Sequence, residues 1–370
     1  MRYMVNQTNG KKKILVVDDS ALMRRVLCDI INNDERFEVA DRAINGIDAL
    51  EHLKNKRYDA VVLDVLMPKM DGLELLRELR KLKIPAKIMM ASTYTGEGED
   101  VTIEALSLGA MDFIKKPDSV SGVLVDSFKT KMLNTLETVA NARLLIPEPP
   151  TIVHSARPAE AGRAGVSGLR AGGPVGDKIV AIATSTGGPR ALQSVIPYLP
   201  VNLDAPVVLV QHMPKGFTAS LAERLDSISE IHVKEAEEGE ALRKGTVYLS
   251  MGGQHMNVQK TGYDKYVIHY TDEPSREGVK PSANYMYESL ADSDFKSIIC
   301  VVMTGMGADG TEGIRNLKKS KSITVIAQDR ESSTVYGMPR SVVNAGLSDR
   351  EVPLKQIAQE IVHYVGVHST

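Results

Sequence analysis

The chain has 370 residues, a length that fits two domains better than one. Hydrophobic residues make up 43% of it and charged residues 25%, so each half can bury an ordinary core. The formal net charge of −2 argues against nucleic acid or an anionic membrane surface as a partner. No apolar run is long enough for a signal peptide or a membrane span, so we expect a cytoplasmic protein without membrane insertion. Cys28 and Cys300 lie far apart in apolar contexts and predict two buried thiols.

Residues 12–118 alternate short apolar runs with amphipathic helical patterns. The runs contain too many adjacent hydrophobic residues for a half-exposed sheet and predict buried parallel strands. They read KILVV, FEVADRA, DAVVLDV, AKIMMAS and MDFIKKP, with helical stretches SALMRRVLCDIINN, GIDALEHLKN, GLELLRELRKL and EDVTIEALSLG between them. A longer helix over 123–143 has Val125, Phe128, Met132, Leu136 and Val139 on one face. Residues 1–143 are therefore predicted to form a flavodoxin-like (βα)5 domain with a doubly wound parallel sheet.

The composition changes between the two halves of the chain. Residues 147–176 hold five prolines and six glycines without apolar periodicity, so we expect a linker over about 144–177. From residue 178 to 370 the α/β alternation resumes. Its strand-like runs read KIVAIATS, APVVLVQHM, GTVYLSM, KYVIHYTD, SIICVVMTGM and ITVIAQD, with helical stretches such as GFTASLAERLDSI and MPRSVVNAG. The second domain is predicted to be doubly wound α/β, with a mostly parallel sheet.

Polar side chains follow four strands of the first domain. Asp18 and Asp19 end the first strand, Asp64 the third, Ser92 the fourth and Lys116 the fifth. The carboxyl ends of parallel strands meet at one edge of a sheet, where ligands bind. Three carboxylates can share that edge if a divalent cation such as Mg²⁺ binds their oxygens. The plainer alternatives are an N-cap for Asp19, a turn for each aspartate and a solvated surface position for Lys116.

The stretches ILVVDDS, VVLDVLMPKMDG, MMAS and DFIKKP together resemble the response-regulator receiver domain, over about residues 12 to 130. The resemblance implies that Asp64 accepts a phosphoryl group from a histidine kinase. It also implies that Mg²⁺ is held by Asp18, Asp19, Asp64 and the main-chain carbonyl of Leu66. Ser92 would sense the phosphoryl group, Lys116 would pair with it, and Phe113 would be an aromatic side chain that reorients.

Ser185 stands between the apolar run IVAIAT and two glycines. It fits a nucleophile on a tight strand-to-helix turn, a residue of a phosphate-binding glycine loop, or a plain connection. The phosphate-loop pattern G-x-x-x-x-G-K-[ST] is missing. Glycines at this place permit a sharp turn and a close approach of backbone N–H groups to an oxyanion.

A serine becomes a nucleophile when a base takes its proton and a third group orients that base. His212 directly follows a buried strand, and Asp309 lies in the turn TGMGADGTEG after another. Three such residues at three carboxyl ends of one sheet predict a Ser–His–Asp unit. Its chain order argues against the α/β-hydrolase fold. The remaining histidines of this domain lie in ordinary contexts: His232, His255, His269, His363 and His368.

The stretches STGGP, QHMPKGFTASLAERL, TGMGADGTEG and VIAQDRESSTVYGMPRSV resemble the catalytic domain of the chemotaxis protein-glutamate methylesterase (CheB) family, over about residues 178 to 366. The resemblance implies Ser185 as nucleophile, His212 as general base, Asp309 as orienting carboxylate and the Met306 backbone N–H as oxyanion donor. It implies a phosphorylation-regulated hydrolase that demethylates glutamates, and can deamidate glutamines, on the cytoplasmic helices of chemoreceptors. No cofactor is expected for hydrolysis, and Mg²⁺ is expected for the receiver.

Three stretches depart from the family pattern. Ala183 and Thr184 precede Ser185 where glycine and alanine are usual, and SMGGQHM replaces an alanine-proline-glycine-glycine stretch. KPSAN stands where arginine-proline-serine-valine-aspartate is common, and its Asn284 is expected to affect substrate contacts or the support of the site. Two other functions remain as alternatives: a response regulator with a DNA-binding output, and an adaptor that kept the fold without activity. The charge and the lack of a helix-turn-helix pattern argue against the first, and the complete Ser–His–Asp set argues against the second.

Overall fold

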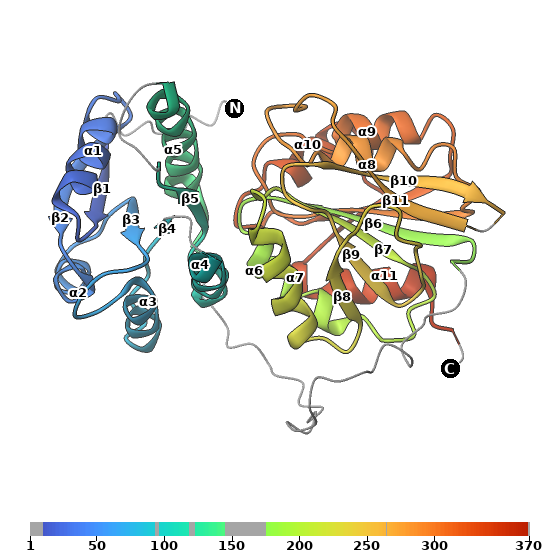
Figure 1. The fold of residues 1–370 in the computed structure, drawn as a ribbon, viewed down its shortest axis with the longest axis horizontal. Helices are drawn as coiled ribbons and strands as arrows, with labels where there is room; N and C mark the ends of the chain where they lie inside the picture. Colours follow the sequence, from blue (N-terminus) through green and yellow to red (C-terminus); the bar gives the residue numbers. More distant parts are fainter. Residues whose placement is uncertain (1–9, 93–95, 118–122, 145–174, 264, 369–370) are drawn as a thin grey trace, which may run out of the picture. The chain divides into compact units, whose positions relative to one another are not determined.

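The structure, a computed structural model, describes residues 10–92, 96–117, 123–144, 175–263 and 265–368; of 96–98 and 123–126 it describes the backbone alone. The chain divides into two compact units, Met1–Ile146 and Pro147–Thr370 (Figure 1). Most of the predicted linker, residues 145–174, lies outside the described residues. Among the described residues, no helix is long and apolar enough to cross a membrane.

The first unit contains a five-stranded parallel sheet in the order β2-β1-β3-β4-β5. Its strands are β1 Lys12–Val17, β2 Phe37–Ala43, β3 Ala60–Asp64, β4 Ile88–Ser92 and β5 Asp112–Lys115. Its helices are α1 Ala21–Asn32, α2 Gly46–Asn55, α3 Gly72–Lys81, α4 Gly96–Leu108 and α5 Val123–Asn141. Helix α1 packs with α5, and α3 packs with α2 and α4, on opposite faces of the sheet (Figure 1). The predicted (βα)5 fold is confirmed.

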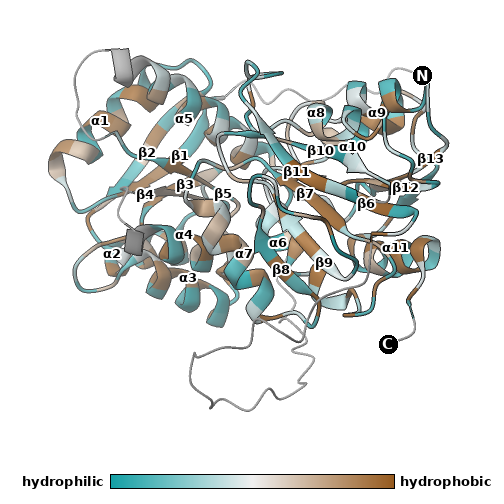
Figure 2. Ribbon diagram, turned by 45° about the vertical axis from the view of Figure 1, so that its right-hand side comes forward, coloured by the Kyte–Doolittle hydropathy of each residue, from teal (hydrophilic) through white to brown (hydrophobic). Residues whose placement is uncertain are grey.

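Helix α5 packs its predicted apolar face on the sheet. Phe128, Met132, Leu136 and Val139 are buried, and each such side chain stabilises the fold by roughly 1.5–3 kcal/mol. The side chain of Val125 lies outside the described residues. Figure 2 shows the hydrophobic residues concentrated on the central strands of each unit.

Ser20, not Asp19, caps the N-terminus of α1. The Ser20 hydroxyl oxygen accepts a hydrogen bond from the Met23 N–H at 3.3 Å. The N-cap alternative for Asp19 is therefore wrong, because the helix begins one residue later than that alternative requires. Asp19 is left exposed at the end of β1.

The second unit contains a seven-stranded parallel sheet in the order β14-β13-β12-β6-β7-β9-β8. Its strands are β6 Lys178–Thr184, β7 Val207–Gln211, β8 His232–Glu235, β9 Thr246–Leu249, β12 Ser297–Val302, β13 Ile323–Gln328 and β14 Arg350–Val352. Its α-helices are α6 Gly188–Leu192, α7 Phe217–Ser227, α8 Ala283–Glu288, α9 Thr311–Leu317, α10 Met338–Asn344 and α11 Ile357–Val365. Helices α8, α9 and α10 pack on one face, while α11 covers β6 and β12 on the other (Figure 1).

The run KYVIHYTD does not join the parallel sheet. It forms β11, Lys265–Thr271, which pairs antiparallel with β10, His255–Gly262. Tyr266 and Ile268 are buried while their neighbours are more exposed. This period of two is typical of a ribbon with one covered face. Helix α8 packs on β10, so the ribbon and α8 together form a layer beside the sheet.

Candidate functional site

Ser185 lies in the first turn after β6, at the carboxyl end of the central strand. Its backbone N–H donates to the Thr304 carbonyl at 3.0 Å. Its own carbonyl accepts from the Gly188 N–H at 2.7 Å and from the Gln211 amide nitrogen at 3.1 Å. Backbone contacts on both sides therefore fix the position of this half-buried serine.

The two glycines after Ser185 are required by the geometry of the turn. Gly187 has φ of 77°, a left-handed conformation that favours glycine. A Cβ atom on Gly188 would lie 2.0 Å from the Gln211 side-chain oxygen. That oxygen accepts a hydrogen bond from the buried Thr184 hydroxyl at 2.6 Å. Thr184 is one of the departures from the family pattern. Its hydroxyl holds the Gln211 side chain, which in turn bonds to the Ser185 carbonyl.

His212 follows the neighbouring strand β7, in which Gln211 is paired with Thr184 of β6. Its N–H donates to the Thr184 carbonyl at 3.1 Å, so Ser185 and His212 follow directly after paired strand ends. The His212 Nε2 atom lies 2.8 Å from Oδ2 of Asp309, in the loop between β12 and α9. The predicted histidine and aspartate are thus brought together. Among the described residues the Ser185 hydroxyl makes no hydrogen bond to His212; such bonds are often long in free enzymes and tighten with substrate.

The Asp309 carboxylate is buried and accepts three further hydrogen bonds. The Ser282 hydroxyl donates to Oδ1 at 2.7 Å, the Ala283 N–H to Oδ2 at 2.6 Å and the Asn284 N–H to Oδ1 at 3.1 Å. Burial raises the pKa of Asp309, but the bonds from His212, Ser282 and Ala283 lower it more, so the pKa lies below its ordinary value. The carboxylate is ionised at neutral pH and is held in one orientation.

Met306 lies in the same loop as Asp309, and its side chain is half exposed. Its neighbour Gly305 contacts the serine turn, because a Cβ atom there would lie 2.7 Å from Cβ of Ser185. The Gly305 carbonyl accepts from the backbone N–H groups of Gly337 and Met338 at 3.0 and 2.8 Å. The backbone that carries Met306 is therefore fixed beside Ser185.

The residues that support Asp309 come from KPSAN. Ser282 and Ala283 were not predicted, whereas Asn284 was expected to affect substrate contacts or the support of the site. Asn284 is fully buried, and its side-chain oxygen accepts from the N–H groups of Gly310 and Gly313 at 3.0 and 2.6 Å. Its amide nitrogen donates to Oε1 of Glu277 at 2.9 Å. Asn284 thus fixes the turn that carries Asp309.

We expect Asn284→Asp to lower the free energy of unfolding of this unit by about 1–3 kcal/mol, because a buried donor becomes a carboxylate oxygen facing Glu277. Urea unfolding of the full chain measures the change. Glu277→Gln, which supplies an amide donor to the new carboxylate, should restore most of the loss in the double variant. Equal losses with and without Glu277→Gln would contradict this account of the pair.

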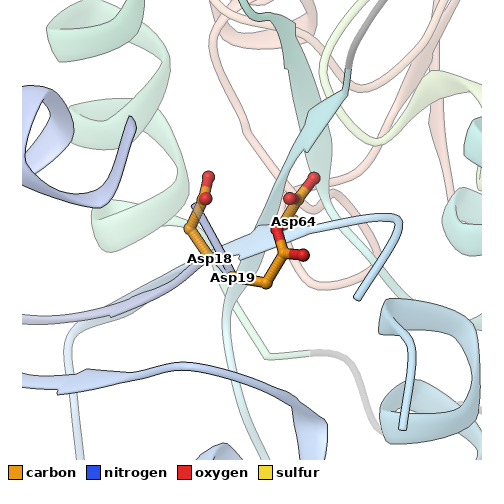
Figure 3. Close-up of side chains that lie close together, drawn as sticks. All are labelled: Asp18, Asp19 and Asp64. Atoms are coloured by element: carbon orange, nitrogen blue, oxygen red, sulfur yellow. The ribbon is translucent and has the colours of Figure 1, made fainter. Parts of the chain in front are cut away.

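The acidic cluster of the first unit lies at the carboxyl ends of β1 and β3. Ligand oxygens of Asp18, Asp19 and Asp64 all lie within 4.8 Å of one another (Figure 3). Asp18 and Asp64 are buried and Asp19 is exposed. Three carboxylates at this spacing form a donor set that suits a hard cation such as Mg²⁺.

Lys116 joins this cluster from the end of β5. Its Nζ lies 2.8 Å from Oδ2 of Asp18 and 2.7 Å from Oδ2 of Asp64, and the lysine side chain is 5% exposed. The surface alternative for Lys116 is therefore wrong. Burial raises the pKa of Asp64 to about 6, Lys116 opposes this, and Asp18 adds to it.

The other predicted receiver residues lie on β4, on β5 and in the loop after β3. Ser92 is buried at the end of β4, and its carbonyl accepts from the Lys116 N–H at 2.7 Å. Phe113 is buried on β5, and Leu66 lies in the loop two residues beyond Asp64. Ser92 and Lys116 are thus joined at neighbouring strand ends, beside Asp64.

Comparison with known proteins follows the same division. The response regulator receiver domain matches residues 14–124, and the CheB methylesterase matches residues 180–361. A protein-glutamate methylesterase/protein-glutamine glutaminase of Geobacillus kaustophilus is 43% identical over 355 residues, which cover 96% of this chain and 99% of the relative. The chain belongs to the CheB methylesterase family.

A second curated relative agrees with the assignment to the CheB family. A protein of the same name from Bacillus subtilis is 42% identical, with 95% of this chain and 98% of the relative covered. The crystal structure of the Thermotoga maritima CheB methylesterase catalytic domain is 44% identical, with a TM-score of 0.49, and covers 51% of this chain and 99% of that one. The resemblance to the receiver domain and to the methylesterase is confirmed, and so is the predicted class of enzyme. The alternative of a response regulator with a DNA-binding output is wrong, because the second domain is a methylesterase domain.

Proposed function

We propose that this CheB-family chain is a serine hydrolase that cleaves γ-glutamyl methyl esters on the cytoplasmic helices of chemoreceptors, giving glutamate and methanol. The observation that carries the proposal is the 2.8 Å contact of His212 with Asp309, at the end of the strand that pairs with the strand leading to Ser185. The names of the relatives support both the ester substrate and a second activity on protein glutamine.

The proton positions follow from the charge of Asp309. An ionised carboxylate only accepts hydrogen bonds, so the His212 Nε2 facing it carries the proton. The free lone pair of the imidazole is then on Nδ1, and we assign Nδ1 as the atom that takes the Ser185 proton. Asp309 keeps the ring in this tautomer and stabilises the imidazolium as it forms.

Ester hydrolysis then takes two steps. The Ser185 oxygen attacks the ester carbonyl, and the Met306 N–H stabilises the oxyanion. Methanol leaves with the proton that His212 had accepted, and an acyl-enzyme remains. Water attacks this intermediate, again through His212, and frees the glutamate carboxylate. A glutamine amide would pass through the same tetrahedral oxyanion and release ammonia.

His212 and Asp309 should act with Ser185 as one unit. We therefore expect the rate loss of a His212→Ala/Asp309→Asn double variant to be close to that of the more damaging single variant. Initial rates of methanol release from the two single variants and the double variant test this. A double loss equal to the product of the two single losses would mean that the residues act independently.

In the receiver, Asp64 is proposed to accept the phosphoryl group of a histidine kinase. Asp18, Asp19, Asp64 and the Leu66 carbonyl would hold Mg²⁺, which when bound offsets the negative charge of that group. The Lys116 ammonium would form an ion pair with the phosphoryl oxygens, and the Ser92 hydroxyl would donate a hydrogen bond to them. The Phe113 side chain would reorient in response. The close carboxylates and the buried lysine support this assignment.

We further propose a receiver over residues 1–143, a linker over 144–177 and a catalytic domain over 178–370. The buried, unpaired cysteines Cys28 and Cys300 support action in the cytoplasm, where the proposed substrate helices and kinase also lie.

The deciding experiment measures methanol release from methylated receptor membranes by the full chain, with and without Mg²⁺ and a small phosphodonor. Release that rises with the phosphodonor supports the proposal. Absence of release under both conditions would favour the non-catalytic adaptor.

A further inference from the structure

Two stretches that contain departures from the family pattern meet beside Asp309. The first, SMGGQHM, leads into β10 and contains His255; the second, KPSAN, leads into α8 and contains Ser282. Both residues are fully buried. They lie outside the parallel sheet, in the layer formed by the β10–β11 ribbon and α8. The orienting aspartate is therefore held from a layer that carries none of the other proposed catalytic residues.

A chain of hydrogen bonds runs from His255 to His212. Ser282 donates its hydroxyl proton to Oδ1 of Asp309 at 2.7 Å and its N–H to Nδ1 of His255 at 3.1 Å. Asp309 in turn accepts from Nε2 of His212 at 2.8 Å. The His255 ring therefore fixes the backbone of the residue whose hydroxyl fixes the carboxylate.

The protonation state of His255 is set by its partners. Because Nδ1 accepts the Ser282 N–H, the ring proton lies on Nε2, which is 3.3 Å from the Pro274 carbonyl. Burial lowers the pKa of the imidazole and keeps the ring neutral. Tyr285 packs beside it, with ring centroids 4.6 Å apart.

The two carboxylate oxygens of Asp309 have different tasks. Oδ2 faces His212, and Oδ1 accepts from the Ser282 hydroxyl and the Asn284 N–H. The hydroxyl is the only side chain, among the described residues, that donates to Oδ1. Without it the carboxylate loses a charge-assisted hydrogen bond, can rotate away from His212 and becomes more basic.

We propose that Ser282 and His255 are positioning residues of the hydrolase, Ser282 by orienting and tuning Asp309 and His255 by fixing Ser282. The inference rests on the proposed function of Ser185, His212 and Asp309. It assigns a task to His255 and Ser282, which lie in two stretches that also contain departures from the family pattern. Both side chains are fully buried, so we expect them to affect the rate of turnover and not the binding of substrate.

Full-length Ser282→Ala tests the first part, with methanol release as the assay. The expected result is a fall in kcat of roughly 10- to 100-fold, the effect of one hydrogen bond to a charged group, with KM nearly unchanged. The acidic limb of the kcat profile should also move to higher pH, because a more basic Asp309 holds the proton of His212 more tightly. Ser289→Ala is the matched control. Ser289 is a partly buried serine at the end of α8, and its hydroxyl bonds to the Val258 N–H and the Met286 carbonyl and does not contact Asp309.

His255 is tested by a conservative pair. His255→Asn keeps an acceptor near the position of Nδ1, whereas His255→Leu removes it. We expect His255→Asn to retain at least tenfold more kcat than His255→Leu, and equal values overturn the role of His255. This pair also decides the proposal if Ser282→Ala does not fold.

The outcomes separate this inference from the proposed function. A Ser282→Ala enzyme that matches Ser289→Ala in kcat and pH profile overturns the role of Ser282. If Ser282→Ala matches its control while Ser185→Ala is inactive in the same assay, the proposed function stands and only the role of Ser282 is overturned. An active Ser185→Ala enzyme means that the proposed function itself is wrong.

Discussion

Replacing Ser185 with alanine is expected to reduce methanol release by a factor on the order of 10⁴ to 10⁶ while the fold is kept. In the proposed mechanism the serine oxygen is the atom that bonds to the substrate, and alanine has no oxygen in its place. Its turn is fixed by backbone bonds to Thr304 and Gly188, which do not involve the hydroxyl. The alanine variant should therefore unfold at the same urea concentration as the parent protein.

Ser194→Ala is the matched control for the Ser185 variant, because Ser194 is a partly buried serine just after the same short helix. It should keep the activity of the parent protein. Residual activity of Ser185→Ala within about tenfold of the parent would show that another residue is the nucleophile. The urea unfolding curve of Ser185→Ala is measured first, because its activity is compared with that of the parent only when both proteins unfold cooperatively at the same urea concentration.

The residues that the sequence predicted well are those at the ends of parallel strands. Asp18, Asp64, Ser185 and His212 each follow an apolar run directly. In a parallel sheet all such ends lie on one edge, so their position in the fold follows from their position in the chain. The residue types then indicate the chemistry. No knowledge of side-chain packing is needed for this step.

The support of Asp309 could not be predicted in the same way. His255 and Ser282 are 27 residues apart, and their contact depends on how the antiparallel ribbon and α8 pack beside the sheet. Periodicity within one segment carries no information about such a contact. His255 therefore appeared as an ordinary histidine, although it is fully buried behind the site.

Short and isolated strands were missed for a related reason. β8 and β14 have only four and three residues, and only one residue of each is buried, so neither carries a recognisable hydrophobic pattern. β10 has a mixed polar sequence, HMNVQKTG, and becomes a strand by pairing with β11. The hydrophobic pattern of a single segment predicts a strand poorly when the segment becomes a strand only by pairing with another strand.

Phosphorylation at Asp64 is expected to raise methanol release, and Asp64→Asn is expected to abolish that rise completely. The carboxylate oxygen of Asp64 lies 2.7 Å from the Lys116 ammonium and close to Asp18 and Asp19. A phosphoryl group there would carry about −1.5 to −2 charges in place of the single charge of the carboxylate, next to the Lys116 ammonium. An asparagine amide has no anionic oxygen to form the acyl phosphate.

The measurement combines methanol release with labelling by a radioactive phosphodonor in the presence of Mg²⁺. The label on the parent protein should be lost in hydroxylamine, as expected of an acyl phosphate.

Asp29→Asn is the control, because Asp29 is an exposed aspartate of the same unit, paired with Arg25 on the surface of α1. It should label and respond like the parent protein, because an exposed carboxylate on a helix lacks the neighbouring lysine and acidic cluster. Equal labelling of Asp64→Asn and the parent would place the phosphorylation on another residue. If the parent protein is labelled, Asp64→Asn is not, and methanol release does not rise, then phosphorylation of the receiver controls something other than the rate of hydrolysis.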